Sequence, residues 1–253
     1  PGPMVLSFHG GPEGQARPFF RASFQALLAR GISVFDPNVR GSSGFGKTFV
    51  NLDNGALRFD GIRDIESTVK FVTEAGLADP ERIGIMGGSY GGYMVMRAMT
   101  HTPEEFAVGV NLFGVTNWIR TLKSIPPWWA SFKDALYKEL GDPYSADSVR
   151  LKAISPLFHT DKVTKPLIVL QGAQDPRVLQ VESDEIVAGA AGGPKWLILG
   201  HLDRFLFGQW FAGRTDPLFL LGSSIGSWRF AAASRRERVA TLDRFESAYI
   251  RQA

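Results

Sequence analysis

The sequence predicts an α/β fold with a mostly parallel central sheet flanked by helices. The main observation is alternation: over the first three quarters of the 253 residues, short apolar runs take turns with segments of helical periodicity, as βαβ units require. A second observation is that glycine-rich turns close several of the apolar runs. The third is composition, because 44% hydrophobic and 21% charged residues are ordinary for a globular protein with a sizeable core.

Each expected strand is one of these short apolar runs. The run at 4–8 ends at His9-Gly10-Gly11-Pro12, and the run at 32–35 leads into a glycine-rich loop at 40–46. Three further strands are expected at 82–86, 108–113 and 167–170.

The expected helices separate these strands. They lie at about 19–30, 61–75, 93–100 and 181–188. The second is the clearest, because its apolar residues recur at helical spacing: Ile62, Ile65, Val69 and Val72. The segment 116–150 fits no strand pattern, and we expect it to form a small lid or cap over the sheet edge. Trp128 and Trp129 in this segment could line an acyl or aromatic pocket, or could be buried as lid packing.

A sharp turn joins the expected strand at 82–86 to the next helix. Its sequence, Gly87-Gly88-Ser89-Tyr90-Gly91-Gly92, carries the G-x-S-x-G pattern in the strand–turn–helix context that gives this pattern its meaning. Residues two before and two after the serine must be small, because side chains there would strike the strand or the helix. The turn exposes the hydroxyl beside the positive end of the following helix. We therefore expect an α/β-hydrolase fold with Ser89 as nucleophile; the alternative is a chance glycine-rich turn.

A serine nucleophile needs a base, and the base needs an acid to orient it. In this fold the chain order is Ser, then Asp or Glu, then His. Asp175 follows the expected strand at 167–170, where the acid belongs, although it could also be a turn aspartate before a proline. His201 is the only one of the four histidines beyond Asp175. By elimination it is the expected base, and a structural loop histidine is the alternative.

Four motifs in this order resemble the catalytic domain of the prolyl oligopeptidase family. They are His9-Gly10-Gly11-Pro12, Asn38-Val39-Arg40-Gly41-Ser42-Ser43-Gly44-Phe45-Gly46, the turn at 87–92, and Gln171-Gly172-Ala173-Gln174-Asp175-Pro176-Arg177-Val178. The resemblance covers residues 1–187 and implies that Ser89 and Asp175 are triad members. It also implies that the backbone N–H groups of Gly11 and Tyr90 bind the oxyanion.

Two features depart from that family. The family places a β-propeller ahead of the hydrolase domain, whereas this sequence starts at the strand before the first glycine loop, so we expect open access to the site. The Gly-His-Gly-Phe expected near the carboxyl end is missing. Residues from about 188 instead resemble the opening of a patatin-like phospholipase, with Gly192-Gly193-Pro194-Lys195 as its oxyanion loop and Gly222-Ser223-Ser224-Ile225-Gly226 as its serine elbow.

The charge pattern also changes near residue 188. Residues 1–187 hold 19 Lys and Arg against 20 Asp and Glu, while residues 188–253 hold 9 against 5. We therefore expect a chimera, with a prolyl-oligopeptidase-like core at 1–187 and a patatin-like tail at 188–253 that completes the same domain or packs on it. Ser224 is then expected in a strand–turn–helix that packs on the sheet; an independent nucleophile is the alternative.

Together these residues predict acyl transfer through a covalent acyl-serine. Ser89 attacks the carbonyl, His201 removes its proton, and Asp175 orients the imidazole. The expected function is that of a carboxylesterase acting on small acyl esters, because an alcohol leaves more readily than an amine. One alternative, implied by the resemblance, is a serine peptidase acting on short acylated or proline-containing peptides. The other is a catalytically dead, hydrolase-like binding protein.

Other classes of function are disfavoured. The absence of cysteine excludes thiolate chemistry, and no pair of histidines has metal-ligand spacing, so neither a metal nor another cofactor is expected. The loop at 40–46 lacks the Gly-Lys-Ser/Thr ending of a phosphate loop. Nucleic-acid binding is not expected, because the net charge is only +3 and Arg235, Arg236 and Arg238 fit a solvated helix face. No apolar run approaches the ~20 residues of a membrane span, and no secretion signal is visible, so the cytoplasm is the default location.

Overall fold

The computed structural model of the chain describes residues 1–125, 127–190 and 239–244. The chain divides into two compact units, Pro1–Asp184 and Glu185–Ala253. The sheet and the candidate site belong to the first unit. The expected base His201, the second serine Ser224 and the patatin-like elements around them lie outside the described residues.

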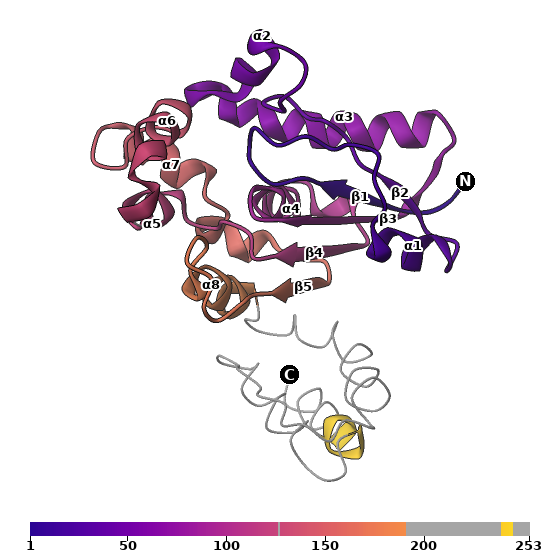
Figure 1. Cartoon of the computed structure of the whole chain (residues 1–253). Helices are drawn as coiled ribbons and strands as arrows, with labels where there is room; N and C mark the ends of the chain where they lie inside the picture. The colour runs from indigo at the N-terminus through magenta and orange to yellow at the C-terminus, as the bar shows by residue number, and fades with distance from the viewer. Residues whose placement is uncertain (126, 191–238, 245–253) are drawn as a thin grey trace. The chain divides into compact units, whose positions relative to one another are not determined.

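Five parallel strands form one sheet in the order β2-β1-β3-β4-β5 (Figure 1). They are β1 (Gly2–Phe8), β2 (Ser33–Phe35), β3 (Ala78–Gly88), β4 (Val108–Leu112) and β5 (Leu167–Leu170). All five strands expected from the sequence are present. Strand β3 is longer than the apolar run at 82–86, because Ala78 pairs with Gly2 across a break in the register with β1. That pairing leaves no trace in the hydrophobic pattern.

Helices connect and cover these strands. They are α1 (Ala22–Leu28), α2 (Lys47–Val50), α3 (Gly61–Glu74), α4 (Tyr90–His101), α5 (Trp118–Lys123), α6 (Ala130–Leu140), α7 (Asp147–Ile154) and α8 (Gln180–Ala190). Short 3₁₀ helices are η1 (Asn51–Asp53), η2 (Gly55–Asp60), η3 (Pro103–Glu105), η4 (Pro127–Trp129) and η5 (Pro156–Lys162). The chain therefore has the parallel sheet flanked by helices that the sequence predicts.

The core lies between the central strands and the helices α3 and α4. Helix α3 buries Ile65, Val69 and Val72 of the stripe that its spacing predicts, whereas the fourth member, Ile62, is partly exposed. Helix α4 is almost entirely buried from Tyr90 to Thr100, and it packs on β1, β3 and β4 as well as on α3. It begins at Tyr90, before the expected 93, because Gly91 and Gly92 are helical here although glycine usually disfavours a helix.

The segment expected to form a lid is helical and carries no strand over its described residues. Helices α5, α6 and α7 gather beyond the carboxyl ends of the strands, towards which the arrows of β4 and β5 point (Figure 1). Across all the residues that the structure describes, no helix combines the length and the apolar character that crossing a bilayer demands.

The strand order reverses between β1 and β3. The chain leaves β1 for β2 on one side, then crosses back to β3 and continues to β4 and β5 on the other. Open α/β sheets bind ligands where the strand order reverses in this way, outside the carboxyl ends of the strands. The loop that starts at His9 follows β1 at this point, and Ser89 follows β3.

Candidate active site

Ser89 lies between β3 and α4 in a sharply turned backbone conformation. Its φ is 56° and its ψ is −118°, a region that residues with a Cβ adopt only when their surroundings fix them. The N–H of Ser89 donates to the carbonyl of Leu112 in β4 at 3.0 Å, and its own carbonyl accepts from the N–H of Tyr93 at 3.0 Å. The neighbouring strand and the following helix therefore hold the serine in place from both sides.

The glycines around Ser89 allow α4 to approach the end of β1 closely. A Cβ at Gly87 would lie 2.5 Å from the carbonyl oxygen of Gly91. A Cβ at Gly91 would overlap the carbonyl oxygen of Phe8, the last residue of β1. These contacts agree with the requirement for small residues two before and two after the serine. They also show a second reason for it, because the end of β1 excludes a side chain at Gly91, as the turn itself does at Gly87.

The loop after β1 brings a second backbone segment to the serine. A Cβ at Gly10 would lie 3.5 Å from the Cβ of Ser89, so this loop crosses directly over the nucleophile. Gly11 has a φ of +140°, and a Cβ there would meet the backbone nitrogen of Glu13 at 2.6 Å. Only glycine fits at this position, which explains the second glycine of the Gly-Gly pair in the motif.

Gly11 and Tyr90 line the same cavity as Ser89. Tyr90 is the first residue of α4, so its N–H has no acceptor within the helix. Helix N-termini carry partial positive charge, and backbone N–H groups held beside a nucleophile stabilise negative charge as it develops on the attacked carbonyl. The geometry therefore suits the oxyanion-binding role that the family resemblance implies for these two residues.

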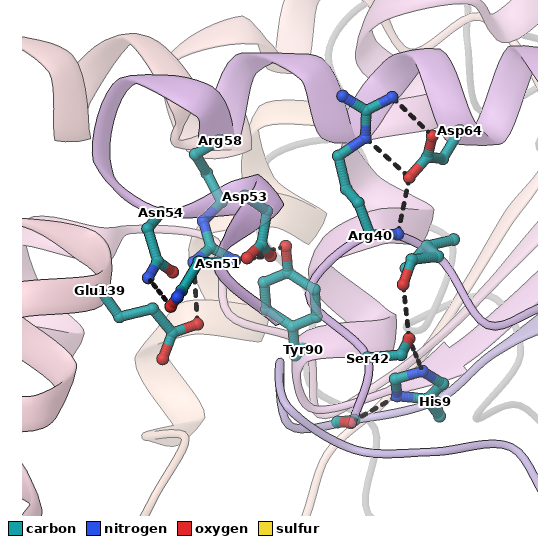
Figure 2. Close-up of polar contacts among 12 residues, drawn as sticks. His9, Arg40, Ser42, Asn51, Asp53, Asn54, Arg58, Asp64, Tyr90 and Glu139 are labelled. Atoms are coloured by element: carbon teal, nitrogen blue, oxygen red, sulfur yellow. Dashed lines mark hydrogen bonds and ion pairs between the residues drawn. The ribbon is translucent and has the colours of Figure 1, made fainter. Parts of the chain in front are cut away.

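A buried hydrogen-bond chain supports the loop that carries Gly11. The hydroxyl of Ser42, which is completely buried, donates to the carbonyl of Val39 at 2.6 Å, and its oxygen lies 2.8 Å from Nε2 of His9, within hydrogen-bond distance. Nδ1 of His9 lies 2.7 Å from the carbonyl oxygen of Gly10 (Figure 2). Val39 and Ser42 of the motif at 38–46 thus brace the loop above Ser89.

The cavity at Ser89 has a volume of about 80 Å³ and a mainly apolar wall. Its remaining wall residues come from the loop after β1, the lid segment and the turn after β5: Pro12, Val115, Trp118, Thr121, Leu122, Ile125, Trp129, Leu136, Leu140, Arg177 and Val178. The cavity is therefore suited to a small apolar side chain or acyl group.

The two tryptophans of the lid segment have different surroundings. Trp129 lines the cavity, and the guanidinium of Arg177 lies 4.8 Å from the centre of its ring. Trp128 is 69% exposed and is not part of the cavity wall, so neither a pocket role nor buried packing describes it here. Sequence reasoning missed Arg177, whose signal was its position two residues after the expected acid.

Asp175 lies in the turn that follows β5. Its Oδ1 accepts from the backbone N–H of Arg177 at 2.8 Å and from that of Val178 at 3.1 Å. Both of these residues line the cavity, so the turn brings the aspartate to the cavity's edge. Among the residues that the structure describes, no donor contacts Oδ2, which leaves this oxygen to orient a base.

The three described histidines do not line the cavity at Ser89. Both ring nitrogens of His9 are engaged in the loop above the serine. His101 ends α4, about 18 Å along the helix from Ser89 at 1.5 Å per residue, and its ring packs against that of His159 at 5.9 Å. Partial burial, together with the charge of Arg97, lowers the pKa of His101 to about 4.

A buried carboxylate anchors the start of the lid segment. Glu182, which is 1% exposed, accepts from the backbone N–H groups of Thr116 at 2.9 Å and Asn117 at 2.6 Å. It also accepts from the Thr116 hydroxyl at 2.7 Å. These bonds fix the residues that follow Val115, where the chain enters the cavity wall.

Comparison with known proteins supports the family resemblance. The profile described as prolyl oligopeptidase family matches residues 18–190. The chain is 43% identical over 190 residues to dipeptidyl peptidase family member 6 of Caenorhabditis elegans, which covers 74% of this chain and 26% of that protein. It is also 43% identical over 188 residues to dipeptidyl aminopeptidase BIII of Pseudoxanthomonas mexicana, covering 74% of this chain and 27% of that protein.

A solved structure gives the same result. A puromycin-hydrolyzing peptidase of Mycobacterium tuberculosis matches with a TM-score of 0.67 and 27% identity, over 75% of this chain and 28% of that one. The chain thus spans about a quarter of the length of each of these relatives.

These relatives bear on two expectations from the sequence. All three are named as peptidases, so they favour the peptidase alternative over the carboxylesterase that the sequence analysis preferred. None of them bears on a patatin-like tail or on a chimera, and both remain predictions.

Proposed function

The chain belongs to the prolyl oligopeptidase family, and we propose that it carries out acyl transfer as a serine peptidase, with Ser89 as the nucleophile. One observation carries the proposal. Ser89 stands at positive φ at the head of a buried helix, and it lines one apolar cavity together with Gly11 and Tyr90. This combination places a hydroxyl, two candidate oxyanion donors and a site for a substrate side chain in one place.

The proposed mechanism assigns one role to each group. The Ser89 hydroxyl attacks the substrate carbonyl, and His201 accepts its proton while Asp175 orients the imidazole. The N–H groups of Gly11 and Tyr90 donate to the oxygen that becomes negatively charged. The imidazolium returns the proton to the leaving amine, and water then hydrolyses the acyl-serine with the same imidazole as base.

The cavity supports a preference on the acyl side of the cleaved bond. Its wall is mainly apolar, and its volume of about 80 Å³ suits a short apolar residue. The exposed Arg177 at its edge offers a planar set of donors to a substrate carbonyl or carboxylate. Short peptides with a small apolar residue before the scissile bond are therefore the proposed substrates.

A fluorophosphonate probe tests the nucleophile. It reacts with an activated serine and ignores an inert one, so it also separates an enzyme from a dead, hydrolase-like binding protein. We expect the full chain to be labelled at Ser89, and Ser89→Ala to abolish labelling. The matched control is Ser224→Ala, which should leave labelling unchanged. Labelling that survives in Ser89→Ala and disappears in Ser224→Ala would assign the chemistry to the tail.

The base is tested separately, because His201 lies outside the described residues. Loss of the base should lower kcat for p-nitrophenyl butyrate by at least about 10²-fold in His201→Ala, the scale on which acid–base catalysis contributes. His159→Ala is the control, since its ring packs on His101 at the far end of α4 and its Nε2 lies 3.0 Å from the carbonyl oxygen of Ala153 in α7. Equal kcat in His201→Ala and the parent would exclude His201 as the base.

Chromogenic substrates decide between peptide and ester. We expect hydrolysis of dipeptide p-nitroanilides with a small apolar second residue, besides the more easily cleaved p-nitrophenyl esters. Turnover of the esters without turnover of the anilides would identify the enzyme as a carboxylesterase and contradict the peptidase proposal. Arg177→Ala should raise KM for the dipeptide anilides about 10-fold, equivalent to ~1.4 kcal/mol, and should leave KM for p-nitrophenyl acetate unchanged.

A further inference from the structure

A buried ionic cluster lies behind the nucleophile. Arg58, which is 2% exposed, donates through Nη1 to Oδ2 of Asp53 at 2.6 Å and through Nη2 to Oε1 of Glu139 at 2.9 Å. The same Nη1 donates to the hydroxyl of Tyr90 at 2.8 Å. Figure 2 shows these four side chains converging from different elements.

Burial makes this cluster depend on all its members. Asp53 is 1% exposed, Glu139 is 8% exposed and Tyr90 is 3% exposed. Burial raises the pKa of Asp53 and that of Glu139, and the charge of Arg58 opposes both shifts. A buried arginine needs such partners, because an unpaired charge in this environment is strongly unfavourable. The geometry of the guanidinium therefore fixes the position of the groups around it.

The cluster joins the lid to the residue after the nucleophile. Glu139 belongs to α6, whose Leu136 and Leu140 line the cavity, whereas Tyr90 opens α4. The ring of Tyr90 is also packed against Tyr93 at 5.2 Å and Trp118 at 6.1 Å between ring centres. Among the residues the structure describes, Arg58 is the charged residue that donates a hydrogen bond to the Tyr90 hydroxyl.

We propose that Arg58 is a positioning residue that holds the Tyr90 side chain against α6 and thereby sets the direction of the Tyr90 backbone N–H. This inference rests on the proposed function, in which that N–H donates to the oxyanion. A planar guanidinium can bond two carboxylates and a phenol at fixed angles, whereas a lysine ammonium offers one compact point charge. Conservative substitution at Arg58 should therefore disturb the rate of the chemical step more than substrate binding.

The experiment compares Arg58→Lys and Tyr90→Phe with the parent in the full chain. Tyr90→Phe removes only the hydroxyl that accepts from Arg58, and it keeps the ring and the backbone N–H. Removal of a whole oxyanion donor costs ~10²–10³ in kcat, so a displaced donor should cost about 10-fold. We expect kcat for p-nitrophenyl butyrate to fall about 10-fold in each variant, with KM changed less than about twofold.

Two further measurements distinguish positioning from a general structural effect. Replacement of the substrate carbonyl by a thiocarbonyl weakens its hydrogen bonds to backbone donors, so the ratio of ester to thionoester kcat should shrink in both variants. The matched control is Arg40→Lys, which also lies in the connection between β2 and α3. Arg40 forms a two-point ion pair with Asp64 and does not contact Tyr90. The kcat of Arg40→Lys and its ratio of ester to thionoester kcat should therefore equal those of the parent.

Each outcome has one meaning. If Tyr90→Phe keeps the parental kcat and ratio, the positioning role is wrong, whether or not Arg58→Lys folds. A parent that is neither labelled at Ser89 nor active would refute the proposed function and this inference with it. An active parent with unaffected variants would refute the inference alone.

Discussion

Replacement of Gly91 by alanine should destabilise the protein, contrary to what helix propensity alone implies. Gly91 is the second residue of α4, and alanine is the better helix former by ~1 kcal/mol in a helix interior. The added Cβ would overlap the carbonyl oxygen of Phe8, and it would lie 2.8 Å from the carbonyl carbon of Phe8 and 2.9 Å from the carbonyl oxygen of His9. All three atoms are backbone, so no side chain can rotate away.

The steric effect should therefore outweigh propensity. Relief requires α4 to move away from β1, and overpacking of this kind costs ~1–3 kcal/mol, occasionally more. We expect Gly91→Ala to lower the free energy of unfolding by about 1–2 kcal/mol, which is the upper part of the overpacking range less the ~1 kcal/mol gained in helix propensity. The displaced helix carries Ser89 and Tyr90 with it, so turnover of p-nitrophenyl butyrate should fall as well.

Urea unfolding followed by tryptophan fluorescence measures the effect. The matched control is Gly61→Ala at the first residue of α3, where a Cβ would have nothing within 4 Å. This variant should be stabilised by ~0.4–1 kcal/mol, because alanine restricts the unfolded chain. Gly91→Ala with an unfolding midpoint at or above that of the parent would refute the close approach of α4 to β1.

Three further perturbations have defined outcomes. Ser42→Ala leaves the ring of His9 without its buried partner and should lower the free energy of unfolding, measured by heating, by about 2 kcal/mol. It should also lower kcat, and an unchanged kcat would show that other residues hold the loop in place. Glu182→Ala leaves the buried donors of Thr116 without an acceptor and should lower the free energy of unfolding in urea by about 3 kcal/mol. Glu182→Gln should recover part of this loss, and equal losses in the two variants would contradict the role of the carboxylate. The pKa of His101 falls from 6.5 in the unfolded chain to about 4 in the fold. The contribution of the neutral His101 ring to the free energy of unfolding is therefore intact above pH 6.5 and is lost as the pH falls towards 4. The half-exposed ring limits this loss to about 1 kcal/mol, and unfolding at pH 7.5 and 4.5 should show a smaller difference in His101→Gln than in the parent.

Local features of the site could be predicted from the sequence. The turn at Ser89 depends on six consecutive residues, and its glycines are required by contacts within that turn and with the adjacent strand end. The same holds for the loop at Gly11, whose motif encodes a backbone that only glycine adopts. The sheet was equally accessible, because each strand contains a short apolar run, although β3 extends beyond its run at 82–86.

Contacts between distant segments could not be predicted in this way. Arg58 and Glu139 are 81 positions apart, and Thr116 and Glu182 are 66 apart. In the sequence each resembles an ordinary surface residue, because a charged side chain in a polar segment is usually solvated. Only the fold shows that they are buried and paired, so neither the cluster nor the lid anchor was expected.

The expected preference for esters over peptides depended on leaving-group chemistry, because an alcohol leaves more readily than an amine. The relatives favour a peptidase instead, and no sequence pattern in the site itself discriminates between the two. The expectation of open access depended on where the sequence begins. The relatives extend well beyond the region they share with this chain, so that expectation stays a prediction.

The sheet positions the reacting groups, whereas the lid segment forms much of the remaining cavity wall, and this difference affects how each part should open locally to solvent. Ser89 and Gly11 are held by the ends of the central strands β3 and β1, whose amide hydrogens should exchange with solvent only on global unfolding. Part of the cavity wall comes from the helices α5 and α6, which lie beyond the strand ends and should exchange through smaller openings. Substitutions at cavity-lining positions of these helices outside the Arg58 cluster, such as Thr121 and Leu136, can therefore alter which acyl groups enter without loosening the strand ends that hold Ser89.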